Sequence, residues 1–266
     1  GSVSTDDRVM TSQPLAHKRL GLAQDEAFCF YYEANLAWLR SLGAELVPFS
    51  PLRDRLPPNL DALYLGGGYP ELHADRLAAN TDGRADLLDF CRSGRPVYGE
   101  CGGLMALSQA IETEAGSFPA IGALPFAVRL GRRPVLGYVE VAIDPTVTRP
   151  IEPTLTPSIN PPFTCRGHWF HYSEIIWLDR GENEQIGSIS SLEKQDESGD
   201  RSHTQRSQLK YAYQITTSQA KTITEGYSVG HVLASYVHLH FAGNLPLTSW
   251  LFDRLIAQNA NKNKSN

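Results

Sequence analysis

YGECGGL, at residues 98–104, places a cysteine between glycines, after a short apolar stretch and before a helical one. Strand, nucleophile and helix in this order form the sharp turn called a nucleophile elbow, here with cysteine in the position that serine often takes. Small flanking glycines leave room around a strained backbone. The helix N-terminus should favour the thiolate of Cys101. The pattern predicts a nucleophilic Cys101, and a buried structural cysteine is the alternative.

Strands and helices alternate on both sides of this turn in the first half of the chain. The apolar patterns predict strands at residues 20–23, 44–49, 60–65 and 96–99, and helices at residues 28–42, 71–80, 85–93 and 104–111. Such alternation is typical of a mostly parallel sheet with helices on its faces. The fold class expected is therefore α/β.

After residue 115 the chain is richer in Pro, Thr and β-branched residues, which predicts β-rich additions. One domain is expected over residues 18–258, between a flexible segment 1–17 that begins with an apparent Gly1-Ser2 tag scar and a flexible tail 259–266. Residues 182–209 are polar and predict a flexible insertion loop. The remaining predicted elements are strands near 135–142, 169–177 and 229–241 and a helix at 246–257.

Composition excludes several classes of protein. The 266 residues include 24 Lys and Arg against 29 Asp and Glu, a net charge of −5, whereas a nucleic-acid binder normally carries a basic surplus. No apolar run reaches the roughly 18 residues of a membrane helix. Hydrophobic residues make up 41% of the chain, enough for a core. We therefore expect no nucleic acid and no membrane among its partners.

The four cysteines form no CxxC pair, so their spacing predicts neither a zinc site nor a disulfide framework. Because the N-terminus lacks a secretory signal, we expect reduced thiols in a cytoplasmic protein.

A nucleophilic thiol needs a base, and the final predicted strand offers two histidines. His238 and His240 alternate in SYVHLHF, so both side chains should lie on one face, and either could face the elbow. A metal pair is the alternative, although no third ligand lies nearby.

Two further stretches are candidates for the site. Gly66-Gly67-Gly68 follows a predicted strand and either offers N–H groups to an oxyanion or is only a tight turn. RGHWFHYS, at residues 166–173, is either a strand with Trp169 and His171 on one face or a wall of the substrate or ammonia path. The chain has neither GxxxxGK[ST] nor GxGxxG, so an ATP site would have to come from elsewhere.

Five blocks occur in order between residue 20 and about residue 257 and resemble a known family. They are DEAFCFYYEANLAWLRSLGAELVPFSPLRD, LYLGGGYPELHADRLAAN, PVYGECGGLMALS, RGHWFHYS and ASYVHLHFAGN. Together they resemble the C-terminal glutaminase domain of the cobyrinate a,c-diamide synthases, in the cobyric-acid-synthase branch of class I glutamine amidotransferases. The resemblance implies a flavodoxin-like, three-layer fold.

The resemblance also implies roles for residues. Cys101 would attack the glutamine amide to give a thioester, and His238 would be its base and acid. Gly67, Gly68 and the Gly102 N–H would form the oxyanion hole. Most class I members carry Glu two residues after the histidine, where this chain has His240. The implied machinery is a Cys–His dyad or one with a different third member, for which His240 is a candidate.

In the family, ammonia reaches an N-terminal P-loop synthetase domain, where ATP and Mg²⁺ activate the a and c acetate groups of cobyrinate. The resemblance implies L-glutamine as the substrate here and no cofactor in this chain. Three alternatives stay open: another acceptor such as hydrogenobyrinate, a non-catalytic binding module, and a stand-alone cysteine hydrolase. The chain departs from the family pattern at Cys29, where Asn is expected, and at Trp169, where Glu is expected.

Overall fold

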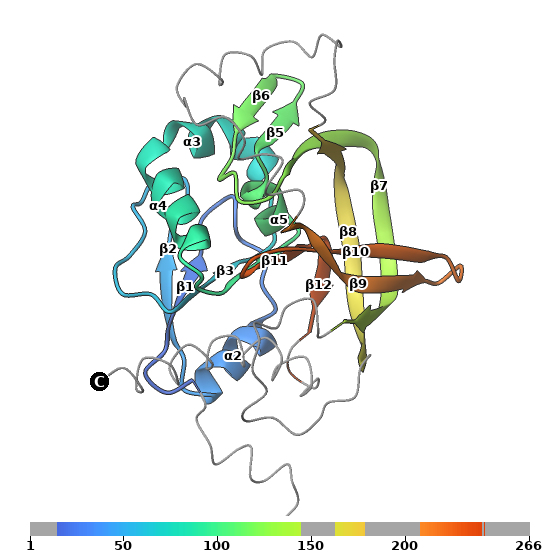
Figure 1. Ribbon diagram of the computed structural model, residues 1–266, viewed down its shortest axis with the longest axis horizontal. Coiled ribbons are helices and arrows are strands. Elements are labelled where there is room, and N and C mark those ends of the chain that lie inside the picture. The colour runs from blue at the N-terminus through green and yellow to red at the C-terminus, as the bar shows by residue number, and fades with distance from the viewer. Residues whose placement is uncertain (1–14, 145–162, 179–207, 241, 243–266) are drawn as a thin grey trace, which may run out of the picture.

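The computed structural model describes residues 15–144, 163–178, 208–240 and 242 (Figure 1). The sequence also predicted a flexible N-terminus, an insertion loop, a helix at 246–257 and a flexible tail. Residues 1–14, 182–207, 246–257 and 259–266 of those predictions lie outside the described residues.

One sheet runs through the whole described chain, in the order β12-β8-β7-β9-β10-β11-β4-β3-β1-β2. Its first half is parallel: β2 (Glu45–Phe49), β1 (Arg19–Ala23), β3 (Ala62–Leu65), β4 (Val97–Glu100) and β11 (Val232–Ser235). Its second half is antiparallel: β10 (Thr222–Val229), β9 (Lys210–Thr217), β7 (Phe126–Ile143), β8 (Phe163–Trp177) and β12 (Val237–Leu239). The short strands β5 (Ala110–Thr113) and β6 (Gly116–Pro119) extend from β7.

Helices cover both faces of the parallel half. On β3, Ala62 and Tyr64 belong to the apolar cluster that contains α2 (Glu33–Ser41). Leu63 and Leu65 belong to the other cluster, with α3 (Ala74–Ala79), α4 (Thr81–Arg92) and α5 (Gly102–Leu107). Because strand side chains alternate between faces, these two clusters are the two sides of one sheet. The predicted α/β fold with three layers is confirmed, and its β-rich second half is the antiparallel half.

Several predicted boundaries were wrong. The helix predicted at 28–42 begins only at Glu33, because Asp25 Oδ1 accepts the N–H groups of Ala27 and Phe28 and holds a turn there. The helix predicted at 104–111 ends at Leu107, and β5 follows. Strands β9 and β10 were not predicted.

The strand predicted at 229–241 is three separate pieces. The chain turns at Gly230, where φ is +56°, so that β10 and β11 pair antiparallel. β11 then pairs with β4, whereas β12 pairs with β8 (Figure 1). A continuous apolar pattern conceals the break between β11 and β12 because both pieces are fully buried.

The elbow depends on a close approach between α5 and β3. A methyl group on Gly103 would lie 2.1 Å from the carbonyl oxygen of Leu65. Only glycine therefore allows α5 to begin where it does.

Gly103→Ala should lower the free energy of unfolding by about 1–3 kcal/mol, because the added methyl forces the helix off the sheet. Urea unfolding followed by circular dichroism measures the change. Gly137→Ala is the matched control, since nothing lies within 4 Å of a methyl group there. Equal stability of the two variants would contradict the close approach.

Candidate active site

Cys101 lies at the turn between β4 and α5, as the sequence predicted. Its φ of 50° and ψ of −101° are unusual for a residue with a side chain, and they mark a strained turn. The Cys101 N–H donates to the Ser235 carbonyl oxygen at 2.7 Å, which fixes the turn against β11. Its Sγ lies 3.3 Å from the Phe170 carbonyl oxygen, to which the thiol donates. The structure therefore has a nucleophile elbow.

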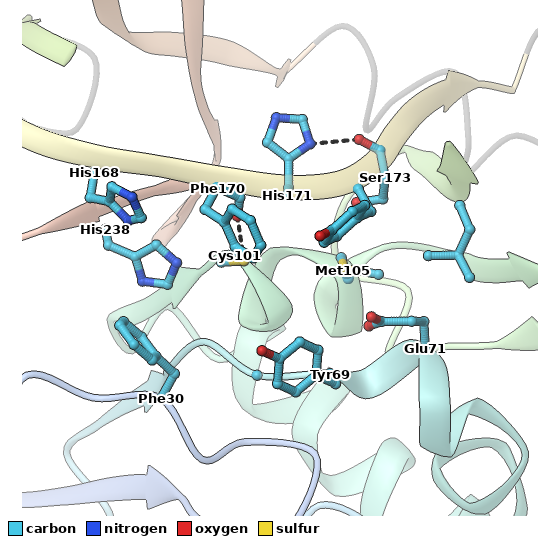
Figure 2. A pocket seen from close by; sticks show the side chains of 13 residues that line it. Phe30, Tyr69, Glu71, Cys101, Met105, His168, Phe170, His171, Ser173 and His238 are labelled. Carbon is cyan, nitrogen blue, oxygen red and sulfur yellow. Dashed lines mark hydrogen bonds between the residues drawn. The ribbon is translucent and has the colours of Figure 1, made fainter. Parts of the chain in front are cut away.

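Cys101 and His238 line the same cavity, whose volume is about 140 Å³ (Figure 2). That volume is below the roughly 300–1,000 Å³ of pockets for drug-sized ligands, so it suits a ligand the size of an amino acid. The other lining residues come from the segment before α2, the glycine loop (residues 66–68) and the residues after it, α5, and strands β7 and β8. They are Phe30, Gly68, Tyr69, Glu71, Met105, Leu130, His168, Phe170, His171, Tyr172 and Ser173.

His238 is buried on β12, with 4% of its surface exposed. The Phe30 ring packs edge-on against its imidazole, with ring centroids 4.9 Å apart. Burial, together with the charge of His168, lowers the pKa of His238 to about 4. Its Nδ1 has no hydrogen-bond partner among the described residues. His238 is therefore a neutral imidazole able to accept a proton.

Burial keeps the Cys101 thiol protonated. Burial, then the charge of Glu71, raises the pKa of Cys101 to about 12, and the Gly102 N–H lowers it only in part. The sequence predicted that the helix N-terminus would favour the thiolate. The Gly102 N–H at the start of α5 does lower the pKa of Cys101, in the predicted direction, but desolvation of the sulfur outweighs it and the thiol stays protonated.

Glu100, to which the sequence assigned no role, links the elbow to the strand that carries His238. Its buried carboxylate accepts hydrogen bonds from Tyr64 Oη at 2.5 Å, Tyr98 Oη at 2.8 Å and the Leu239 N–H at 2.9 Å. Glu100 directly precedes Cys101, and Leu239 directly follows His238. Burial raises the pKa of Glu100 to about 7.

The glycine loop (residues 66–68) approaches the elbow. The three predicted oxyanion donors, Gly67, Gly68 and Gly102, differ in whether their N–H groups are available. The Gly67 N–H donates to the Phe30 carbonyl oxygen at 3.1 Å, so it is already used. Gly68 lines the cavity, and a methyl group on Gly102 would lie 3.0 Å from the Gly68 nitrogen. The structure therefore brings Gly68 beside Gly102, whose N–H lowers the pKa of Cys101. Gly67 packs against the His238 ring instead.

His240 does not share the cavity with His238. Strand β12 ends at Leu239, so the predicted alternation stops before His240, which is exposed and whose Nδ1 contacts the Ala242 carbonyl oxygen. Both imidazoles lie beside the Tyr32 ring, with centroids 6.5 Å from it for His238 and 5.7 Å for His240, but only His238 lines the cavity.

Both interpretations of residues 166–173 hold in part. Trp169 and His171 pack together, with ring centroids 5.4 Å apart. The same strand also supplies a wall of the cavity, through His168, Phe170 and Ser173 (Figure 2).

The described part of the chain contains no group of three or more His, Cys, Asp or Glu placed to hold a metal ion. Within the same residues, no helix is both long and apolar enough to span a membrane.

A family model described as "CobB/CobQ-like glutamine amidotransferase domain" matches residues 19–246. The chain belongs to this family. The domain is similar to proteins named cobyrinate a,c-diamide synthase, with 44% identity to that of Syntrophotalea carbinolica and 37% to that of Synechocystis. These matches cover 84% and 85% of this chain but only 42% and 40% of the relatives, so the chain spans less than half of their length.

Solved structures agree on the fold of this amidotransferase domain. PurLQS from Thermotoga maritima matches with a TM-score of 0.56 at 12% identity, over 91% of this chain and 98% of the other. A structure described as a glutamine amidotransferase matches with a TM-score of 0.52 at 14% identity, over 89% of this chain and 98% of the other.

Alkylation of Cys101 by iodoacetamide should accelerate about tenfold per pH unit from pH 7 to 10 without levelling, because the thiolate fraction grows at that rate below a pKa of about 12. Peptide mass spectrometry measures the rate at each pH. Exposed Cys29 in the same sample is the internal comparison. A plateau below pH 8 would contradict a protonated resting thiol.

Glu100→Ala should destabilise the domain by about 2–5 kcal/mol, because two buried hydroxyls and the Leu239 N–H would lose their acceptor. Urea unfolding measures the loss. Glu33→Ala removes a carboxylate from an exposed pair with Arg40 and should cost less than about 1 kcal/mol. A similar small cost for Glu100→Ala would show that its hydrogen bonds are dispensable.

Proposed function

We propose that this amidotransferase domain hydrolyses L-glutamine through a thioester on Cys101 and supplies the ammonia to a synthetase partner. The observation that carries the proposal is the placement of a thiol and a neutral imidazole on one amino-acid-sized cavity, at a nucleophile elbow. A neutral base and a protonated nucleophile are the pair required for general-base activation.

The first half of the reaction forms the thioester. His238 accepts the thiol proton as the Cys101 sulfur bonds to the amide carbon of glutamine, and the carbonyl oxygen becomes an oxyanion. The N–H groups of Gly68 and Gly102 stabilise that oxyanion. The carbon–nitrogen bond then breaks, and the proton held by His238 goes to the leaving nitrogen, which departs as ammonia.

The second half restores the free thiol. Water gives a proton to His238 and its oxygen bonds to the thioester carbon. The carbon–sulfur bond breaks, and the sulfur regains a proton from His238. One glutamine and one water thus become glutamate and ammonia. The imidazolium and the oxyanion that form during these steps are shielded from water in the buried cavity. Their stability therefore depends on the hydrogen-bond donors around the cavity.

The proposed whole protein is a cobyrinate a,c-diamide synthase. The naming of the relatives and the partial coverage of their length support an additional N-terminal P-loop synthetase domain. There ATP and Mg²⁺ would activate the a and c acetate carboxylates of cobyrinate for attack by ammonia. The small cavity of this domain suits glutamine and not a tetrapyrrole, so the choice between cobyrinate and hydrogenobyrinate would be made in the synthetase domain.

The glutamine analogue 6-diazo-5-oxo-L-norleucine should form one adduct, on Cys101, that excess glutamine blocks. The expectation follows from the approach of a glutamine-shaped electrophile to the elbow thiol. Intact-mass and peptide mass spectrometry identify the adduct. A folded chain that gives no adduct, alone or joined to its synthetase domain, would contradict the proposal.

Variants assign the two catalytic roles. Cys101→Ser and His238→Ala should each lower glutamine hydrolysis by about 10²-fold or more, while the full protein retains amidation with added ammonia. Cys29→Ser is the control for loss of a thiol. His240→Ala should retain hydrolysis because His240 lies outside the cavity, and a loss as large as that of His238→Ala would instead make His240 the third member.

A further inference from the structure

Glu71 brings a half-buried, incompletely paired carboxylate to the cavity wall. It lies on the 3-10 helix η1 (Pro70–His73), directly after the glycine loop. Its Oε2 atom is buried and has no hydrogen-bond partner among the described residues. Burial raises the pKa of Glu71, which expresses the cost of keeping its charge away from water. A buried acceptor without a partner is stabilised by a ligand that donates to it.

The other buried carboxylates near the elbow are already satisfied. Glu100 accepts from two tyrosines and the Leu239 N–H. Glu225 accepts from Ser235 Oγ at 2.6 Å and the Tyr236 N–H at 2.7 Å. Neither lines the cavity, and within the described chain Glu71 is the only acidic side chain that does. A cationic group that entered the cavity would therefore meet Glu71.

The position of Glu71 is fixed relative to the thiol. Pro70 packs on the elbow, since a methyl group on Gly102 would lie 2.9 Å from Pro70 Cδ. The Tyr69 N–H donates to the Ala27 carbonyl oxygen at 2.9 Å and holds the loop before it. In Figure 2, Glu71 and His238 approach the cavity from opposite sides of Cys101. The amide and the α-ammonium group likewise lie at opposite ends of glutamine.

We propose that Glu71 binds the α-ammonium group of glutamine while the amide reaches Cys101. The proposal rests on the proposed glutaminase function and adds the residue that selects an α-amino acid over a simple amide. A charge-assisted hydrogen bond in a buried cavity is strong enough to discriminate between such substrates.

The same contact links substrate recognition to activation of the nucleophile. The negative charge of Glu71 disfavours the thiolate of Cys101. An ammonium group on Glu71 neutralises that charge, so bound glutamine eases ionisation of the thiol that attacks it. A compound without the ammonium group would leave the repulsion in place.

Glu71→Gln keeps the shape of the side chain and removes its charge. The rates at which two reagents label Cys101 in this variant then separate substrate recognition from thiol reactivity. Labelling of Cys101 by 6-diazo-5-oxo-L-norleucine, which carries an α-ammonium group, should slow by about tenfold or more. Alkylation by neutral iodoacetamide should be at least as fast as in the wild type. Asp75→Asn is the matched control, because Asp75 is exposed on α3 and has the same charge change. It should alter neither rate.

Competition with glutaramate, which lacks only the α-amino group of glutamine, tests the ammonium contact directly. Glutamine should protect wild-type Cys101 from iodoacetamide far better than glutaramate, and the difference should collapse in Glu71→Gln. Any of three results in Glu71→Gln would overturn the role of Glu71. They are an unchanged rate of labelling by 6-diazo-5-oxo-L-norleucine, a persistent difference in protection between glutamine and glutaramate, and an equal slowing of labelling with both reagents. If glutamine-sensitive labelling of the wild type persists in those cases, the proposed function stands. Failure of the wild-type protein to be labelled overturns both.

Discussion

The carboxylate of Glu100 is the interaction on which the site depends. It adjoins Cys101 in sequence and accepts the N–H of Leu239, a residue 139 positions away that follows His238. A buried carboxylate is costly unless its oxygens are hydrogen-bonded, and two tyrosine hydroxyls complete its set. Glu100, which adjoins the elbow, is thus hydrogen-bonded to β12, the strand that carries His238. This arrangement gives the site a fixed geometry without an orienting carboxylate on the imidazole.

Both halves of the sheet contribute to the site. The parallel half ends in the elbow, as open α/β sheets commonly place ligands at the carboxyl ends of strands. The antiparallel half contributes a wall through β8, whose Phe170 carbonyl accepts from the Cys101 thiol. β12 pairs with β8 and brings His238 opposite His168. Cys101 therefore comes from the parallel half of the sheet, and His238 comes from the antiparallel half.

The two reactive side chains of the site, Cys101 and His238, are both uncharged. Burial keeps the Cys101 thiol protonated and the His238 imidazole neutral, so neither carries a charge that must be solvated. Reactivity in such a site depends on the ligand that enters it. Glu71 is the exception, since its carboxylate lies in the cavity with an oxygen left for a ligand.

The sequence by itself determined the α/β alternation, the elbow and the choice of Cys101 among four cysteines, because those depend on neighbouring residues and on the period of apolar positions. The resemblance favoured His238 over His240 as the base and implied that Gly67 and Gly68 belong to an oxyanion hole. Only the tertiary structure decided which histidine enters the cavity, because β12 ends at Leu239. It also revealed Glu100 as a link and Glu71 as an incompletely paired acceptor, and it showed that burial of Cys101 outweighs the effect of the helix N-terminus on its pKa. Burial and hydrogen-bond partners decide each of these, and they come from segments far apart in the chain that no local pattern brings together.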